Sequence, residues 1–523
     1  EFPSEIPRIQ TRNYSYTSTL ATIMRNSIFM KKTFILILVF CAFGCQKDKY
    51  FKDLELNGKL QYVGKNPINS KIAEKSSCYF FDTQNDNTKS INYLEFNRVI
   101  YEIRIIKENG FEVRSYFNEK GNPISFNGVY SVRYKIDENG NYETSFNYDK
   151  DNNLIEDDSN IAQYQYFYDD NGFVSKVFYY DKNGNRTELN KASSVNRTFD
   201  KSGNLKTVKF LNDKEELIKN AQGISIIELF YKNNNLIRQV YLDSSNKPTI
   251  DNKGVASIGL GYDSRNNLTS ISNYGLGGVL INPDEDNAKY VYEYDQNNNL
   301  ISTSYFNRDE KLIKNDIAIK KHIRDEFGRI IETQFYNYEE KLTNDNNGIS
   351  IEKNTYDNNN NIISESYFDQ SKKPIVKSGY HKIIYSKNPK GEILSEEYYD
   401  INNQPISNTK GYHLIKYTRN EKGQSTSESY FDTKKQPMTI DDNCHLKKYS
   451  YSENEGLSSI EYYGIDKEPI EKTWDRSKFR DFFGRQGTLI KYSKILYKNH
   501  PKNKSGKTEY VNISGDVVYK SEY

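Results

Sequence analysis

The chain has 523 residues, and its 73 Lys and Arg residues against 71 Asp and Glu residues give a formal net charge of +2. Because binding to nucleic-acid phosphates requires an excess of basic residues, this balance argues against a nucleic-acid partner. The mean hydropathy of −0.86 is typical of disordered chains, but the 45 Tyr and 27 Phe residues are not. Tyr and Phe suit the half-buried surface of a sheet, so we expect an all-β protein.

The first 44 residues predict export from the cytosol. Residues 1–29 do not begin with Met, and we interpret them as upstream or mis-started sequence. Residues 30–44 begin with Met30-Lys31-Lys32 and continue with an apolar run of about a dozen residues, the pattern of a signal peptide. That run is shorter than the roughly 20 apolar residues that a membrane-spanning helix needs.

Cys45 follows the small residues Ala42 and Gly44. This spacing resembles the lipobox of bacterial lipoproteins, which implies that Cys45 is diacylated and anchors the protein in the outer membrane. Two acyl chains are enough for stable anchoring. The polar residues 46–49 resemble the charged stretch that Bacteroidetes lipoproteins use for surface display, and residues 45–75 are predicted to be a tether that leads into the ordered chain. The alternative is an ordinary cleaved signal in which Cys45 has no role.

Cys78 and Cys444 are the cysteines that remain after the signal peptide and Cys45. They lie at opposite ends of the repeats described next, so we expect no disulfide between them. An exported protein without a disulfide must be held together by its packing alone.

A repeat of about 31 residues fills residues 76–471. Its clearest mark is an aromatic pair followed by Asp and then Pro-Ile, as in Tyr367-Phe368-Asp369. A second turn signal, such as Asp137-Glu138-Asn139-Gly140, precedes this mark in each unit. The segments between turns are about 9 and 14 residues long, which suits strands and leaves no room for a regular helix. The mark begins at twelve positions: 116, 147, 179, 210, 241, 274, 305, 335, 367, 398, 430 and 462.

These units predict an all-β, elongated array of antiparallel β-hairpins, in which each unit buries its Tyr and Phe against its neighbours. A β-solenoid with one coil per unit is the alternative. The Tyr-Asp-x-x-Gly-Asn-like turn and the Tyr-Phe-Asp turn resemble the tyrosine–aspartate (YD) repeats of bacterial RHS proteins, over residues 112–470. The resemblance implies a spiralling sheet of hairpins, which in some RHS proteins encloses a toxin. The C-terminal effector and autocleavage motif of toxin-bearing members are not found, so the resemblance implies no activity.

No pattern in the sequence predicts a catalytic, cofactor or metal site. His381, His413 and His445 recur one unit apart. In a hairpin array such residues lie about 9–10 Å apart, too far to share a zinc ion, although in a solenoid they would stack at about 4.8 Å. The Asp/Asn-rich turn at residues 149–153 lacks the Gly and Glu of an EF-hand loop. We find no nucleophile elbow, phosphate loop or zinc-protease motif, and we expect a protein that is not an enzyme.

Residues 472–523 do not follow the repeat until one further hairpin-like segment at residues 510–518. This C-terminal part contains the single tryptophan, Trp474, together with Arg476, Arg480 and Arg485. One interpretation is a cap that covers the last strand edge. The other is a docking element for a partner, because Trp and Arg contribute strongly to interface energies.

We therefore favour a lipid-anchored scaffold of the bacterial cell envelope that binds protein partners. Tyrosines recur at the strand ends of most units, as packing between neighbours requires, whereas a sugar site would show one local cluster of aromatic residues. Many near-equal units also favour avidity for an extended partner over one deep pocket. A glycan-binding surface lipoprotein is the first alternative, and an RHS-like carrier or shell for a toxin is the second.

Overall fold

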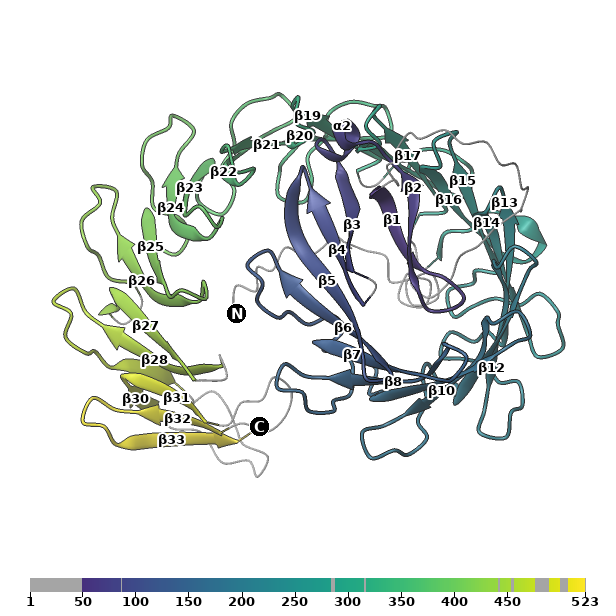
Figure 1. Cartoon of the computed structure of the whole chain (residues 1–523). Coiled ribbons are helices and arrows are strands. Elements are labelled where there is room, and N and C mark those ends of the chain that lie inside the picture. The colour runs from purple at the N-terminus through teal and green to yellow at the C-terminus, as the bar shows by residue number, and fades with distance from the viewer. Residues whose placement is uncertain are drawn as a thin grey trace, which may run out of the picture. The chain divides into compact units, whose positions relative to one another are not determined.

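The computed structural model describes residues 49–522, apart from 86, 284–286, 315–316, 441–442, 453–455, 476–488 and 499–506. Cys45 and the signal segment lie outside the described residues. The chain divides into two compact units: unit 1 ends at Arg329, and unit 2 runs from Ile330 to Tyr523. Both consist of antiparallel hairpins in chain order (Figure 1).

Unit 1 contains nineteen described strands. The first six are β1 (Tyr50–Leu56), β2 (Tyr62–Pro67), β3 (Ser77–Asn85), β4 (Thr88–Glu95), β5 (Arg98–Glu108) and β6 (Phe111–Asn118). The repeats follow as β7 (Ser131–Ile136), β8 (Tyr142–Tyr148), β9 (Gln163–Tyr168), β10 (Val174–Tyr180), β11 (Ser194–Phe199), β12 (Leu205–Leu211), β13 (Ile226–Lys232), β14 (Asn235–Leu242), β15 (Ser257–Tyr262), β16 (Leu268–Tyr274), β17 (Lys289–Tyr294), β18 (Leu300–Phe306) and β19 (Ile319–Arg324). Strands β1 and β2 and helix α2 (Ser70–Ala73) therefore occupy most of the segment predicted as a tether.

Unit 2 continues the same pattern. Its repeat strands are β20 (Ile330–Tyr336), β21 (Ile351–Tyr356), β22 (Ile362–Phe368), β23 (Lys382–Lys387), β24 (Ile393–Tyr399), β25 (Leu414–Arg419), β26 (Ser425–Phe431), β27 (Leu446–Tyr451) and β28 (Leu457–Tyr463). After these come β29 (Lys472–Asp475), β30 (Leu489–Tyr492), β31 (Lys494–Lys498), β32 (Lys507–Val511) and β33 (Val517–Glu522). Strands β29 and β30 form a separate two-stranded sheet, and β31 pairs with β28.

Consecutive strands pair antiparallel from β3 to β19 in unit 1 and from β20 to β28 in unit 2. These pairings confirm the predicted array of antiparallel hairpins. They contradict the alternative, a β-solenoid, because the coils of a solenoid would pair in parallel. Besides α2, the described residues contain the short 3₁₀ turn η1 (Leu276–Gly278). No helix in the described part of the chain is long and apolar enough to cross a membrane.

Asp and Asn side chains shape the hairpin turns. The Oδ1 atom of Asp137 accepts the backbone N–H groups of Asn139 and Asn141 at 2.9 and 2.8 Å, and Gly140 has a φ of +83°. This is the turn chemistry predicted from the sequence, in which Asp bonds to the backbone and Gly supplies the positive φ. The Asp/Asn-rich turn at residues 149–153 has the same two bonds, here to the Oδ1 atom of Asp149 and both at 2.8 Å.

A third turn lies in the segment that returns from one hairpin to the next, and the sequence analysis did not predict it. In the return segment that leads into β21, the Oδ1 atom of Asp345 accepts the N–H groups of Asn347 and Ile349, both at 2.8 Å. Successive return segments also bond to each other, since the N–H of Thr409 donates to the carbonyl of Ser378 at 3.3 Å. Where such a bond forms, a repeat contacts the next one through its return segment as well as through its strands.

The Tyr of the Tyr-Asp pair connects neighbouring hairpins. Its hydroxyl donates to a backbone carbonyl 26 residues earlier, on the adjacent strand that belongs to the preceding hairpin. The observed pairs are Tyr168 to Tyr142 at 2.8 Å, Tyr294 to Leu268 at 2.9 Å, and Tyr356 to Ile330 at 2.9 Å. Tyr451, which is followed by Ser452 instead of Asp, makes the same bond to Ser425 at 2.8 Å. In this motif, Asp forms the turn and Tyr bonds to the preceding unit.

One predicted repeat position is wrong by one residue. The first residue of each repeat mark, which we call the anchor, donates its N–H to the carbonyl that ends the return segment, as Tyr305 does to Ala318 at 2.9 Å. Asn273 makes the same bond to Ala288 at 2.8 Å, so the anchor is Asn273 and not Tyr274. The sequence misled because only the second residue of this pair is aromatic.

The main core lies on the inner face of unit 1, by which we mean the sheet face that carries the anchor side chains. Val177, Leu205 and Val208 belong to this apolar cluster. Leu60, from the turn between β1 and β2, packs into it with 5% of its surface exposed, and the carbonyl of Gly58 accepts the N–H of Val174 at 2.8 Å. The inner face of unit 1 therefore has an apolar core that residues from outside the repeats help to fill.

Candidate functional site

The inner face carries a run of carboxylates in unit 2. Two residues before the anchor, the repeats of unit 1 have the core residues Val177 and Val208, each 3% exposed, and otherwise Arg114, Ser145, Gln239, Ile271 and Thr303. In unit 2 the equivalent positions of β22, β24 and β26 are Glu365, Glu396 and Glu428. Because strand side chains alternate between faces, each Glu lies on the same face as its anchor tyrosine. Three successive carboxylates thus occupy a position that holds a core valine in two repeats of unit 1.

Each of the first two glutamates accepts two tyrosine hydroxyls. Glu365 accepts the hydroxyl of its anchor Tyr367 at 3.1 Å, and that of Tyr385 on β23 at 3.0 Å. One unit later, Glu396 accepts the hydroxyls of Tyr398 at 2.6 Å and of Tyr417 at 2.9 Å. In both cases the two hydroxyls bond to different carboxylate oxygens.

The third glutamate, Glu428, has a tyrosine at the equivalent position and an additional lysine. We call each glutamate with its tyrosines a step. Glu428 accepts the hydroxyl of Tyr449, and its Oε1 lies 3.3 Å from the Nζ of Lys447. The same Nζ lies 5.4 Å from the ring centroid of the anchor Tyr430. We call the repeated set the glutamate–tyrosine ladder, which consists of Glu365, Tyr367, Tyr385, Glu396, Tyr398, Tyr417, Glu428, Tyr430 and Tyr449.

The hairpin array sets the spacing of the ladder. Consecutive glutamates are two strands apart, which places them about 9.5 Å from each other across the sheet. The anchor tyrosines are buried, and the glutamates are half-buried. The ladder is therefore a regular polar strip on a sheet face rather than a pocket.

Burial fixes the roles of donor and acceptor. It raises the pKa of Tyr385, Tyr398 and Tyr417 far above the usual value of about 10, and the neighbouring carboxylate of Glu365 or Glu396 raises it further. These hydroxyls therefore stay protonated and donate. The ladder can hold and orient a charged group, and its acceptors face the same way at each step.

The residues predicted to form a docking element fall mostly outside the described part of the chain. Trp474 lies in β29, and its backbone pairs with Ile490 of β30. Arg476, Arg480 and Arg485 lie outside the described residues, as does the predicted lipidation site Cys45. Their proposed roles stay predictions.

The recurring histidines bond to backbone carbonyls. The Nδ1 atom of His413 lies 2.7 Å from the carbonyl oxygen of Tyr398, and that of His445 lies 2.9 Å from that of Met438. His381 makes the equivalent contact at 3.2 Å with the carbonyl of Ile375. Among the described residues, no group of three or more His, Cys, Asp or Glu side chains is placed to hold a metal ion. Cys78 and Cys444 are buried free thiols.

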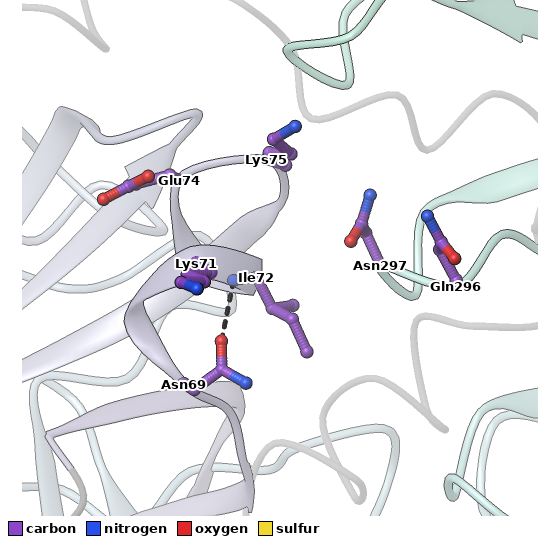
Figure 2. A pocket seen from close by; sticks show the side chains of 7 residues that line it. All are labelled: Asn69, Lys71, Ile72, Glu74, Lys75, Gln296 and Asn297. Atoms are coloured by element: carbon purple, nitrogen blue, oxygen red, sulfur yellow. Dashed lines mark hydrogen bonds between the residues drawn. The ribbon is translucent and has the colours of Figure 1, made fainter.

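A shallow cavity of about 450 Å³ lies in unit 1 between α2 and the turn of the β17–β18 hairpin (Figure 2). Lys71, Glu74 and Lys75 come from the helix side, and Gln296 and Asn297 from the turn. The nearby Asn69 accepts the N–H of Ile72 at 3.0 Å and so caps the helix. This bond fixes the end of a short helix, and we assign the cavity no ligand.

Sequence reasoning missed the ladder although its signal was present. The carboxylates of β22, β24 and β26 recur 31 and 32 residues apart, and a residue that recurs with a repeat is usually structural. The signal appears when equivalent positions of different repeats are compared. Glu365 and Glu396 occupy the position that Val177 and Val208 occupy in their repeats. Three successive acidic residues at a position that is not acidic in any other repeat are the signal for a specialised face.

No family model matches the chain, and no curated protein matches it. Solved structures that match include the Photorhabdus luminescens Tc holotoxin pore with a mutated TccC3, at 11% identity and a TM-score of 0.20 over 90% of this chain. Another is the TcdB2–TccC3 crystal structure, at 11% identity and a TM-score of 0.20 over 86% of this chain. The chain spans 29% and 28% of the lengths of those chains. With such TM-scores, the fold assignment rests on the hairpins described above.

Proposed function

We propose that this protein is a non-enzymatic scaffold of the bacterial cell envelope, anchored through a lipid on Cys45, and that unit 2 binds a protein partner through the glutamate–tyrosine ladder. The observation that carries the proposal is a run of three regularly spaced carboxylates at a repeat position that is not acidic in any of the other repeats. Burying a carboxylate without a charged partner is costly, so a sheet face that needed only stability would favour an apolar residue such as Val177 or Val208 at this position.

Regular spacing supports a partner that is itself extended. Three equivalent steps about 9.5 Å apart offer the same contact repeatedly, and linked contacts gain affinity by avidity. The lipid anchor is supported by the signal-like residues 30–44 and by the small residues before Cys45. It would hold the repeats at the membrane, where a partner at the cell surface or in the periplasm could meet them.

The partner is tested by crosslinking in the native host cell. The wild-type chain, the double variant Glu365→Gln/Glu396→Gln and the control Glu397→Gln are compared. Glu397 lies on β24 next to Glu396 but on the opposite face, where it pairs with Lys435 at 2.9 Å. We expect a crosslinked protein that is lost in the double variant and kept in the control. A glycan array with the same proteins tests the alternative: saturable binding of one oligosaccharide, with no protein crosslinked, would refute the scaffold.

The anchor is tested separately by radiolabelled palmitate. We expect the wild type to incorporate label and the Cys45→Ala variant to lose it. Label that persists in the variant would mean that Cys45 is not the lipidation site.

A further inference from the structure

Lys447 shows how the ladder holds a cation. Its ammonium group lies between the carboxylate of Glu428 and the ring of Tyr430, at 3.3 Å from Oε1 and 5.4 Å from the ring centroid. A carboxylate supplies a charge-assisted hydrogen bond, and the aromatic face adds a cation–π attraction. At Glu428 the ladder therefore already binds a basic side chain of the protein itself, that of Lys447.

The other two steps have no lysine at this position. Lys447 pairs across the sheet with Glu428, whereas Ile383 pairs with Glu365, and Ile415 pairs with Glu396. Glu365 and Glu396 each accept one hydroxyl per oxygen, and a carboxylate has about four acceptor positions. Both therefore keep acceptor capacity for N–H donors that approach from outside the sheet.

The cations beside these two steps have other contacts. Lys377 lies over the ring of Tyr367 at 4.4 Å, and its Nζ is 3.9 Å from a carboxylate oxygen of Glu352. Arg419 donates to the backbone carbonyls of Ile393 and Gly423, at 2.8 and 2.9 Å. Lys387 lies over the ring of Tyr385 at 5.3 Å. The middle of the strip thus keeps an excess of carboxylates over cations.

Unit 1 shows that this face can be covered by a segment from elsewhere in the chain, here the hairpin turn between β1 and β2. There the segment between β1 and β2 lies on the inner face, with Leu60 in the core, and its backbone bonds through Gly58 to Val174. In unit 2 the same sheet positions carry charge, so the segment that would fit them must be basic rather than apolar.

The spacing defines the conformation of that segment. A polyproline II helix rises about 3.1 Å per residue with three residues per turn, so every third side chain points the same way at intervals of about 9.3 Å. This matches the distance of about 9.5 Å between steps two strands apart. We propose that the ladder binds an extended, polyproline II-like segment of a partner protein that carries Lys or Arg at every third residue and crosses the strands of unit 2. The inference rests on the proposed function and names the chemistry of its partner.

The test is fluorescence anisotropy of a labelled peptide, Lys-Pro-Pro repeated four times, with the full chain. We expect saturable binding that weakens at high salt, as contacts between charged groups do. The double variant Glu365→Gln/Glu396→Gln should bind on the order of tenfold more weakly, since it loses the charge at two steps. The control Glu397→Gln should bind as the wild type does. A peptide with Lys at every fourth residue, whose spacing does not match, should bind more weakly than the first.

A second variant keeps the test informative if the double variant folds poorly. Lys447→Ile installs the residue that the other two steps carry at this position, so it should fold normally and make Glu428 available. We expect it to bind the Lys-Pro-Pro peptide several-fold more tightly. The inference is wrong if the wild type shows no binding, if both lysine spacings bind equally, or if Lys447→Ile has no effect. If crosslinking still finds a partner that requires the ladder, such a result overturns only the chemistry inferred here and leaves the proposed function standing.

Discussion

Gly379 and Gly411 offer a matched pair for measuring how strongly the return segments of neighbouring units interact. Both have a positive φ, +91° and +92°, at equivalent sequence positions of unit 2, Gly379 in the turn from Lys377 to Tyr380 and Gly411 in the turn from Asn408 to Tyr412. A Cβ atom on Gly411 would meet nothing within 4 Å. A Cβ atom on Gly379 would lie 2.8 Å from the backbone nitrogen of Thr409 in the next return segment. The two Ala variants therefore differ in one contact between units.

The expected magnitudes follow from this geometry. Gly411→Ala should cost about 1–2 kcal/mol, the price of a left-handed conformation for an L-residue. Gly379→Ala should cost a further 1–3 kcal/mol or so, because backbone must shift to relieve the overlap. That shift would lengthen the bond from the N–H of Thr409 to the carbonyl of Ser378, now 3.3 Å.

Thermal unfolding followed by tryptophan fluorescence measures this difference. Trp474 is the single tryptophan and belongs to unit 2, so its signal reports on the unit that carries both glycines. For a unit of this size, each kcal/mol lowers Tm by about 2–4 °C. Equal Tm values for the two variants would refute the idea that packed return segments couple neighbouring units.

Three further predictions concern the repeats and one histidine. Tyr451→Phe removes the bond to the carbonyl of Ser425 and should destabilise unit 2 by about 0.5–1.5 kcal/mol in urea unfolding, while the hairpin itself still forms. Deletion of residues 388–419, one whole repeat, should leave a cooperative unfolding transition. A 16-residue deletion should abolish that transition because it joins unlike strands. Equal tolerance of both deletions would contradict the repeat model. Burial lowers the pKa of His322 to about 4, so protonation favours the unfolded chain, and unit 1 should lose stability as the pH falls from about 6.5 to 4. His322→Gln should remove that part of the pH dependence in the same assay.

The sequence by itself determined the repeat and the hairpin. Its information is local: Asp137 and Gly140 form a turn wherever they occur together, because the Asp side chain bonds to nearby N–H groups and Gly accepts the positive φ. Alternation between turns then places residues on one face or the other. The same logic failed at position 274, where the aromatic mark was displaced by one residue while the backbone bond of Asn273 kept the repeat in phase.

Only the tertiary structure showed what each face is packed against. Val177 and Glu365 occupy the same position of the repeat, but Val177 lies in a core that includes Leu60, which is more than a hundred residues away in the chain. No local pattern encodes that contact, since the segment between β1 and β2 has no counterpart among the repeats. The structure likewise showed that Glu365 accepts hydroxyls from two different strands, and that Lys447 binds Glu428 while the equivalent positions are isoleucine. The sequence spacing gives the period at which the glutamates and tyrosines recur. Strand pairing decides which of them contact each other, because side chains from different strands are brought together only when the sheet forms.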